Sequence, residues 1–484
     1  MKGLGAAGPA MLELQPRANA HALIMADFTA AEILSATSGR LAAGREGATC
    51  SGVTTDSRAV AAGQCFLALR GERFDGHDFV DIALRAGAVG AVVSRSPEGL
   101  QRQPESDAFV IVVEDTLKAL GDLARLHRAR FQIPVVGVTG STGKTTTKDM
   151  IATILARRGP VATTPENYNN EIGVPLAVLA LAPEYDTAVI EMAMRGPGEI
   201  AYLAGLAQPT VAVVTNIGLS HLERLGSPEA IADAKGELVE AVGEGTSVLN
   251  RDDAFFERLA RRARGPVVTF GLGEAADFRA LAVTREREGI RFQLVCRGGE
   301  REVRLGTPGQ HQVLNALAAA AAATHARADL EDVVAGLGAF TASRARAQVV
   351  QSRAGFRIID DCYNASPASV EAALELLGDM ATERKVAVLG DMLELGPSAP
   401  ELHRAVGEQA GRTGLDLLIA VGDLGRWIAE GARSSMAPEN VRWTESNEQA
   451  AAWALDAMRP GDVVLVKASR AMAFEQITGR LLSG

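Results

Sequence analysis

Residues 134–146 read Pro134-Val-Val-Gly-Val-Thr-Gly-Ser-Thr-Gly-Lys-Thr-Thr146. The opening run, residues 134–138, is too apolar for a half-exposed strand and predicts a buried one. A glycine-rich turn follows, and the pattern predicts a helix over residues 147–157. This order of strand, loop and helix is typical of a phosphate site, because backbone N–H groups converge on the anion and the helix N-terminus adds positive potential.

Two side chains of this loop point to nucleotide chemistry. Lys144 is placed to reach the outer phosphates, and the hydroxyl of Thr145 can bind Mg²⁺. The usual pattern has glycine where this chain has Val138, so the loop is a shortened variant. The chain has no Asn-Lys-x-Asp box for guanine, which favours ATP. The other residues expected to bind the nucleotide here are Gly140, Ser141, Thr142, Gly143 and Thr146.

Apolar runs recur along the chain with helical segments between them. Residues 188–190 and 211–214 repeat the buried pattern and predict a parallel sheet covered on both faces. Short strands and helices precede this region, and a third set of strands begins near residue 357. The chain is therefore predicted to be α/β, with three domains. The expected divisions are a disordered leader at 1–24 and domains at 25–113, 114–338 and 339–484.

Composition limits the classes of function. The 484 residues carry 49 Lys and Arg against 59 Asp and Glu, a net charge of −10, so no chain-wide basic field is available for nucleic acid or an anionic membrane. Four widely spaced cysteines suit a reducing compartment. Residues 305–326 are uncharged, but they include proline, glycine and amide side chains and predict a loop followed by a helix. We expect a cytoplasmic protein without membrane insertion.

Polar residues follow the predicted central strands. Glu191 stands at the end of one strand, at the edge where ligands bind in open α/β sheets, and can hold Mg²⁺. His221 follows another strand, and Lys235 lies fourteen residues further on. From residue chemistry alone, a lone histidine such as His221 is more often a loop or core residue than a ligand, and Lys235 is by default a solvated helix lysine. Asn167, Asn169 and Asn170 can make turns or present amides to a polar substrate, so they are candidates for substrate binding.

These residues resemble the motifs of the Mur ligase family of peptidoglycan synthesis. The central motifs that carry the resemblance are Gly140-Ser-Thr-Gly-Lys-Thr-Thr-Thr-Lys148, Asn167-Tyr-Asn-Asn-Glu-Ile-Gly-Val-Pro175, Val189-Ile-Glu-Met192, Thr215-Asn-Ile-Gly218 with His221-Leu-Glu223, and Ala234-Lys-Gly-Glu237. The outer ones are Thr55-Asp-Ser-Arg58, Phe74-Asp-Gly-His77, Asp360-Asp-Cys-Tyr-Asn-Ala365, Val388-Leu-Gly-Asp-Met-Leu-Glu-Leu-Gly396 and Lys467-Ala-Ser-Arg470. Together they run from about residue 25 to the end of the chain.

Within the family, the motifs are most similar to those of the enzymes that add D-alanyl-D-alanine to UDP-N-acetylmuramoyl-tripeptide. The resemblance implies a central P-loop ATPase domain between an α/β domain for the UDP end of the substrate and a Rossmann-like domain for the dipeptide. It also implies ATP, two Mg²⁺ sites and an acyl-phosphate intermediate. Apart from the resemblance, a monomer is the default expectation for the oligomeric state.

The resemblance also assigns roles to residues. Glu191 matches a ligand of the first Mg²⁺, His221 a ligand of the second, and Lys235 a lysine carbamoylated by CO₂; with Lys144 they form the expected catalytic set. Asn315 matches an adenine contact, Arg344 a phosphate-side arginine with Arg346 close by, and Asp360 a group near the ribose. Thr55, Ser57 and Arg58 are expected to bind the UDP substrate.

Three alternatives remain at this point. The chain could be a diaminopimelate-adding Mur ligase or a folylpolyglutamate synthetase, although it lacks the Asp-Asn-Pro-Arg segment of the former. It could also be a P-loop switch that only hydrolyses ATP. Departures from the family pattern occur at Ser343, Gln312, Cys362 and Ala468. None of them removes a group that the ligase chemistry needs.

Overall fold

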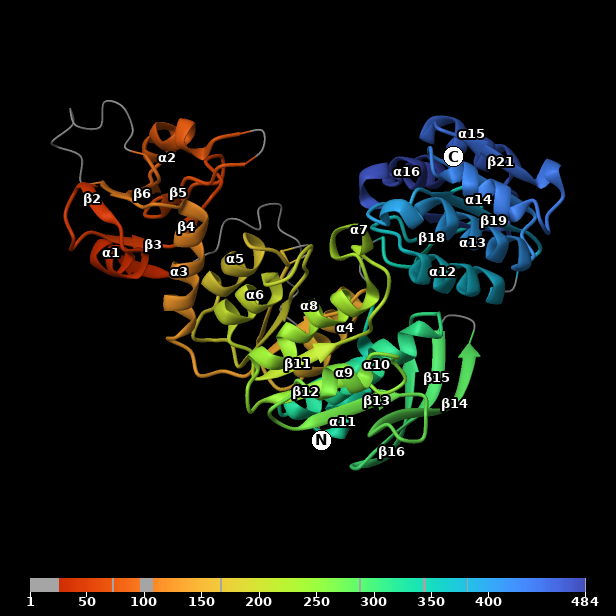
Figure 1. Ribbon diagram of the computed structural model, residues 1–484, viewed down its shortest axis with the longest axis horizontal. Coiled ribbons are helices and arrows are strands. Elements are labelled where there is room, and N and C mark those ends of the chain that lie inside the picture. The colour runs from red at the N-terminus through yellow and green to blue at the C-terminus, as the bar shows by residue number, and fades with distance from the viewer. Residues whose placement is uncertain are drawn as a thin grey trace, which may run out of the picture. The chain divides into compact units, whose positions relative to one another are not determined.

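The computed structural model describes residues 26–71, 74–95, 108–165, 168–286, 289–342, 345–380 and 382–483. The predicted leader at 1–24, Asn167 and Arg344 lie outside these ranges. The chain divides into two compact units, one made of residues 1–131 with 171–183 and the other of 132–170 with 184–484. The predicted α/β class is confirmed, because three main sheets each carry helices (Figure 1).

The first unit contains a five-stranded sheet in the order β2-β7-β6-β5-β4. Strands β4 to β7 are parallel in this sheet, and β2 pairs antiparallel with β7. A separate antiparallel pair, β1 and β3, lies beside it. The strand bounds are β1 Asp27–Thr29, β2 Arg40–Ala43, β3 Thr49–Ser51, β4 Val53–Thr54, β5 Cys65–Leu67, β6 Gly90–Val93 and β7 Phe109–Val112.

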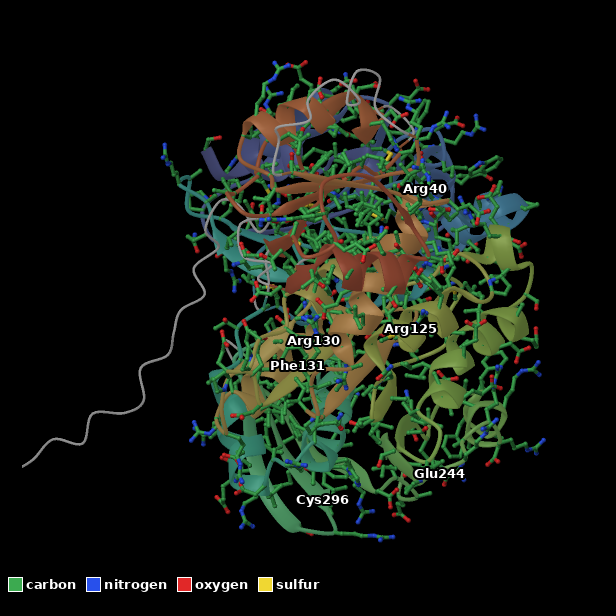
Figure 2. All side chains as sticks on the ribbon, turned by 90° about the vertical axis from the view of Figure 1, so that its left-hand side faces the viewer. Arg40, Arg125, Arg130, Phe131, Glu244 and Cys296 are labelled. Carbon is green, nitrogen blue, oxygen red and sulfur yellow. The ribbon has the colours of Figure 1, made fainter. Side chains whose placement is uncertain are left out.

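Three helices in this unit begin at a capping side chain: Thr29 for α1, Asp75 for η1 and Asp115 for α3. The hydroxyl of Thr29 and the carboxylate of Glu32 form a capping box at the start of α1. Just past the end of α3, the guanidinium of Arg130 donates to the carbonyl of Asp27 at 2.7 Å. Figure 2 shows Phe131 next to Arg130. The helix bounds are α1 Ala30–Thr37, η1 Gly76–Phe79, α2 Val80–Arg85, α3 Thr116–Arg128 and α5 Gly173–Leu179.

The second unit contains a nine-stranded sheet in the order β16-β15-β14-β13-β12-β11-β8-β10-β9. Strands β8 to β14 are parallel to one another, as predicted for the central ones. The sheet is extended by β15, which pairs antiparallel with β14, and by β16, which pairs antiparallel with β15. The strand bounds are β8 Val135–Thr139, β9 Val161–Thr163, β10 Thr187–Glu191, β11 Val211–Val214, β12 Thr246–Asn250, β13 Val267–Gly271, β14 Phe278–Glu286, β15 Gly289–Cys296 and β16 Gly299–Leu305.

Both faces of this sheet are covered. Val213 packs into the core formed with α4 and α10, whereas Val214 packs with Val239 of α8, and neighbouring residues of a strand point to opposite faces. The helix bounds are α4 Lys144–Leu155, α6 Glu199–Ala207, α7 Leu222–Leu225, α8 Pro228–Ala241, α9 Phe256–Ala260, α10 His311–His325 and α11 Leu330–Ala339. The predicted start of α4 at residue 147 is wrong by three residues, because the helix begins directly at Lys144.

Helix α10 is the predicted alanine-rich helix of residues 305–326. Its alanines at 316 and 318–323 are fully buried against α4 and the sheet, since small side chains let the two helices approach closely. Across the described residues, no helix combines the length and the apolar character that crossing a bilayer requires.

The last sheet has six strands in the order β17-β18-β22-β19-β20-β21. All pairs are parallel except β17 with β18, and separate apolar cores lie on its two faces, as in a doubly wound fold. The strand bounds are β17 Gln348–Gln351, β18 Arg357–Asp360, β19 Lys385–Gly390, β20 Leu417–Val421, β21 Val441–Thr444 and β22 Val463–Lys467. The helix bounds are α12 Pro367–Asp379, η3 Gly396–Ser398, α13 Ala399–Arg412, α14 Gly425–Ala432, η4 Pro438–Asn440, α15 Asn447–Ala457, η5 Arg470–Met472 and α16 Glu475–Ser483.

Candidate functional site

The glycine-rich loop joins β8 to α4, and two of its glycines have backbone conformations that other residues rarely adopt. Gly140 has a φ of +146°, and a Cβ there would lie 1.8 Å from Oγ1 of Thr215. Gly143 has a φ of +76°, and a Cβ there would lie 2.3 Å from Oδ1 of Asn315. Helix α4 begins at the next residue and has no side-chain cap, so its first N–H groups remain available for an anion.

The segment after β11 holds the loop in shape. Oδ1 of Asn216 accepts from the N–H of Thr142 at 3.1 Å, and Nδ2 of Asn216 donates to the carbonyl of Thr142 at 3.1 Å. Thr215 Oγ1 donates to the same carbonyl at 2.6 Å, and Ser141 Oγ accepts from the N–H of Gly218 at 2.8 Å. Sequence reasoning gave Asn216 no role, although it lies inside a motif quoted for the family resemblance.

Lys144 is folded back onto the loop. Its ammonium donates to the carbonyls of Gly140 at 2.7 Å and Ser141 at 3.3 Å. Desolvation lowers the pKa of Lys144; the charge of Glu191 opposes that shift, and the charge of Arg346 adds to it. The ammonium therefore lies at the phosphate end of the loop, within electrostatic reach of both groups.

Glu191 is the last residue of β10 and is only 1% exposed. Its Oε2 accepts from Oγ1 of Thr145 at 2.6 Å, and its Oε1 accepts from Nδ2 of Asn169 at 2.8 Å. No ion pair involves this carboxylate among the described residues. A buried hydroxyl and carboxylate beside a phosphate loop are the oxygen donors that Mg²⁺ prefers, so Thr145 and Glu191 fit a metal ion that also binds phosphate oxygens.

Lys235 lies on α8 with 2% of its surface exposed. Within the described ranges, its ammonium has no hydrogen-bond or ion-pair partner. Desolvation places the pKa of Lys235 well below its ordinary value, and the charge of Lys144 lowers it further. Lys235 is thus buried beside the phosphate loop, contrary to the solvated lysine that residue chemistry allowed.

His221 follows β11 in a left-handed conformation, with a φ of 63°. Its Nδ1 lies 2.5 Å from Oε2 of Glu394, a residue from the loop after β19. The hydrogen bond to His221 is the largest influence on the pKa of Glu394, which it lowers. No described contact joins His221 to Glu191, and no group of three His, Cys, Asp or Glu side chains in the described ranges could by itself hold a metal ion.

The residues expected to contact the rest of the nucleotide come from two regions. Asn315 belongs to the region of the nine-stranded sheet, whereas Arg346 and Asp360 belong to that of the six-stranded sheet. Asn315, on α10, donates to Oε1 of Gln312 at 3.0 Å and lies against the phosphate loop. Arg346 lies over the ring of Tyr363 at 4.1 Å. Asp360, at the end of β18, accepts from Oγ1 of Thr478 at 3.3 Å.

The candidate UDP-binding residues belong to the first compact unit. Thr55, Ser57 and Arg58 lie in the turn after β4, and the Arg58 side chain is 87% exposed. Two hydrogen bonds from its guanidinium to Asp56, at 2.7 and 2.9 Å, hold it and raise its pKa. Of the candidate asparagines, the described contacts bring Asn169 to the carboxylate of Glu191, and Asn170 lies exposed beside it.

These features define a P-loop protein that handles a nucleoside triphosphate. They are a mainly parallel sheet, an uncapped helix after a glycine loop, a lysine, and a hydroxyl–carboxylate pair at the strand ends. Three family models match the chain: Mur ligase middle domain over residues 138–323, Mur ligase glutamate ligase domain over 345–470 and Mur ligase family catalytic domain over 49–128. The chain belongs to the Mur ligase family.

Relatives and solved structures agree with this assignment. The UDP-N-acetylmuramoyl-tripeptide–D-alanyl-D-alanine ligase of Bacillus subtilis (strain 168) is 39% identical over 434 residues, covering 89% of this chain and 93% of the relative. A crystal structure of MurF from Acinetobacter baumannii is 32% identical, with a TM-score of 0.88 over 95% of this chain and 100% of that one. MurF from Thermotoga maritima in complex with ADP is 31% identical, with a TM-score of 0.78 over 89% and 96% of the two chains.

Proposed function

We propose that this chain is the ATP-dependent ligase that joins D-alanyl-D-alanine to UDP-N-acetylmuramoyl-tripeptide in peptidoglycan precursor synthesis. The observation that carries the proposal is the bond between Thr145 and Glu191 beside Lys144, in a chain whose full-length relatives bear the name of this activity. That arrangement suits phosphoryl transfer to a carboxylate, which is the step that a ligase of this family requires.

The chemistry proceeds in two steps. A carboxylate is a poor electrophile, so its oxygen first takes the γ-phosphoryl group of ATP, and ADP leaves. The amine of D-alanyl-D-alanine then attacks the carbonyl carbon of the acyl phosphate and forms the C–N bond. The nitrogen loses a proton, and the bond between the carbonyl carbon and the phosphate oxygen breaks, which releases inorganic phosphate. Lys144 and the uncapped start of α4 stabilise the charge that develops on the transferred group.

Thr145 and Glu191 would hold the first Mg²⁺, and His221 is assigned to the second. A bound Mg²⁺ neutralises phosphate charge and aligns the phosphate oxygens. The oxygen donors of Thr145 and Glu191 support the first assignment. The second rests on the family motif at His221, whose Nδ1 faces Glu394 and whose Nε2 has no hydrogen-bond partner among the described residues.

Lys235 is proposed to carry a carbamate, because a lysine that joins a metal site must lose its positive charge. Its neutral amine adds to CO₂, giving a carbamate anion and one proton. Burial, the absence of a partner in the described part of the chain and the lowered pKa support this assignment. We expect a carbamate ¹³C signal after exchange with ¹³CO₂, absent from Lys235→Met. A wild-type chain without that signal contradicts the assignment.

The remaining roles follow the predicted division of the chain. Residues 25–113 bind the UDP end of the substrate, 114–338 bind ATP and 339–484 bind the dipeptide, in a cytoplasmic monomer. The substrate contacts assigned to side chains are Thr55, Ser57, Arg58, Asn167, Asn169 and Asn170. The nucleotide contacts outside the loop are Asn315, Arg344 and Asp360.

The test is phosphate release from the purified chain with ATP and Mg²⁺, adding UDP-N-acetylmuramoyl-tripeptide and D-alanyl-D-alanine separately and then together. We expect phosphate release only with both substrates. The product should be heavier than UDP-N-acetylmuramoyl-tripeptide by the mass of D-alanyl-D-alanine minus one water. Lys144→Met is the control for contaminating ATPases. Release that ignores both substrates would identify a P-loop switch instead, and release with a single amino acid in place of the dipeptide would identify another ligase of the family.

A further inference from the structure

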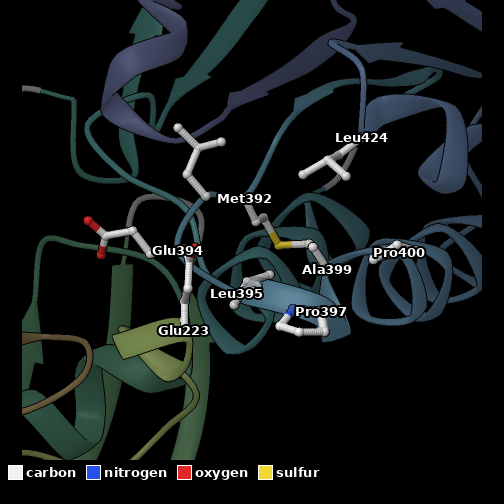
Figure 3. Close-up of a pocket in the computed structure, with 10 residues that line it drawn as sticks. Glu223, Met392, Glu394, Leu395, Pro397, Ala399, Pro400 and Leu424 are labelled. Atoms are coloured by element: carbon white, nitrogen blue, oxygen red, sulfur yellow. The ribbon is translucent and has the colours of Figure 1, made fainter. Parts of the chain in front are cut away.

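Two segments far apart in the sequence meet beside His221. The N–H of Glu223 donates to the carbonyl of Glu394 at 3.2 Å, next to the 2.5 Å contact between the His221 and Glu394 side chains. Gly396 has a φ of +60°, and a Cβ there would lie 3.2 Å from Cα of Glu223. Glu223 and Glu394 come from the two facing segments that line a pocket (Figure 3). The close approach therefore involves backbone as well as side chains.

The loop that carries Glu394 is anchored to its own sheet. The N–H of Met392 donates to Nε2 of the buried His403 at 2.8 Å, and the N–H of Leu393 donates to Oγ of Ser469 at 2.9 Å. Since both bonds lie within two residues of Glu394, they restrict where its carboxylate can go. Glu394 is thus presented to His221 by a fixed backbone.

Both partners have an unfavourable backbone conformation. His221 and Glu394 each have a φ of 63°, in the left-handed region that residues with a Cβ rarely occupy. Such conformations persist where surrounding contacts hold them, and they concentrate at functional sites. The two strained residues face each other, which indicates that the geometry of this pair matters.

The contact determines which imidazole nitrogen carries hydrogen. An ionised carboxylate can only accept a hydrogen bond, so Nδ1 of His221 must be the donor to Glu394. In the neutral ring, Nε2 then keeps its lone pair. Histidines that bind metals generally donate their other N–H in this way to a carboxylate or carbonyl, which sets the tautomer and the ring orientation.

We propose that Glu394 is a positioning residue that holds His221 in the Nδ1–H tautomer and directs its Nε2 to a divalent cation. The inference rests on the metal role proposed above for His221. Because Glu394 follows β19 of the six-stranded sheet and His221 follows β11 of the nine-stranded sheet, the ligand is oriented only while these two segments are in contact.

The first experiment reads the tautomer directly, without metal or substrate. Long-range ¹H–¹⁵N spectra of the full chain with ¹⁵N-labelled histidine, recorded at pH 9, distinguish the two tautomers, and His221→Gln assigns the signal among the seven histidines. We expect Nδ1–H for His221 in the wild type and a mixture in Glu394→Ala. Glu394→Gln should also give a mixture, because an amide can accept or donate, and its near-identical shape guards against misfolding.

Glu223→Gln is the matched control, since it removes a carboxylate from the same pocket. The Glu223 side chain forms no hydrogen bond or ion pair in the described parts of the chain, so its removal should leave the His221 tautomer unchanged. A His221 that remains fully Nδ1–H in both Glu394 variants, or that is Nε2–H in the wild type, overturns the inference.

The second experiment measures Mn²⁺ binding by electron paramagnetic resonance with a non-hydrolysable ATP analogue. We expect His221→Ala to lose one Mn²⁺ and Glu394→Ala to bind that ion about 10- to 100-fold more weakly. Equal binding by the wild type and His221→Ala contradicts the metal role proposed for His221, and with it the functional part of the inference. An unchanged tautomer instead contradicts the positioning alone, so the two failures are distinct.

Discussion

Thr145 Oγ1 donates a 2.6 Å hydrogen bond to Oε2 of Glu191, joining the first turn of α4 to the last residue of β10. Both side chains are buried, and 46 residues separate them in the sequence. Asn169 holds the other carboxylate oxygen at 2.8 Å. The two bonds therefore fix the carboxylate at the carboxyl end of β10, next to the phosphate loop.

Glu191→Gln tests this arrangement. The substitution keeps the shape of the side chain but removes its charge, so the chain should need about 10- to 100-fold more Mg²⁺ for half-maximal ligation, because cation affinity follows ligand charge. Phosphate release across a Mg²⁺ series measures this. Glu244→Gln, which changes an exposed glutamate, is the control (Figure 2). A variant with the wild-type Mg²⁺ dependence would exclude Glu191 as a ligand.

Asn216→Ala should weaken ATP binding by loosening the phosphate loop. The change leaves the N–H and carbonyl of Thr142 without their bonds to the Asn216 amide. Because Thr142 is half-buried and its carbonyl keeps the bond from Thr215, we expect a loss of about 0.5–1.5 kcal/mol, equivalent to roughly 2- to 13-fold in affinity. Calorimetric titration with ATP measures the loss, and Asn440→Ala, at an exposed position, should bind normally. Unchanged affinity in Asn216→Ala would show that the loop needs no such support.

Gly140→Ala and Gly198→Ala separate steric overlap from backbone strain. Both glycines have positive φ, at +146° and +84°, but a Cβ at Gly140 meets Oγ1 of Thr215 at 1.8 Å, while a Cβ at Gly198 meets nothing within 4 Å. Gly198→Ala should therefore lower stability by only about 1–2 kcal/mol, the cost of the conformation. Gly140→Ala should also lose ATP affinity, because the loop must move. Thermal unfolding and ATP titration distinguish these outcomes, and equal ATP affinity in the two variants would contradict the steric explanation.

His403 makes the stability of the six-stranded sheet depend on pH. Desolvation lowers the pKa of His403, and its bond to the carbonyl of Ala399 opposes that shift only in part. As pH falls below about 6.5, the unfolded chain binds a proton that the folded chain does not, so the free energy of unfolding falls until the folded pKa is reached. The slope from this group is at most about 1.4 kcal/mol per pH unit.

His403→Gln should reduce this dependence while its amide oxygen still accepts from the N–H of Met392. Urea unfolding followed by tryptophan fluorescence measures the effect, because all three tryptophans of the chain lie between β20 and β22. Identical pH slopes in the variant and the wild type would show that His403 takes up its proton equally in both states.

The central strands could be predicted because their sequences leave few choices. The runs at 135–138, 188–190 and 211–214 are continuously apolar, and such runs are typical of parallel strands covered on both faces. The antiparallel extension formed by β14, β15 and β16 was not predicted. Strands β15 and β16 are partly exposed and carry charged residues such as Arg291 and Glu302. Their sequences therefore contain no continuous apolar run that would have predicted buried strands.

The sequence by itself determined the chemistry that each segment can offer: the anion-binding turn at 139–144, the hydroxyl of Thr145, the carboxylate at the end of β10 and the family to which these motifs point. Only the tertiary structure decided which of these groups meet. The bond of Asn216 to the phosphate loop, the isolation of Lys235 and the pairing of His221 with Glu394 join residues distant in the chain. Such contacts depend on how whole sheets and helices pack, and local sequence patterns carry no information about that packing.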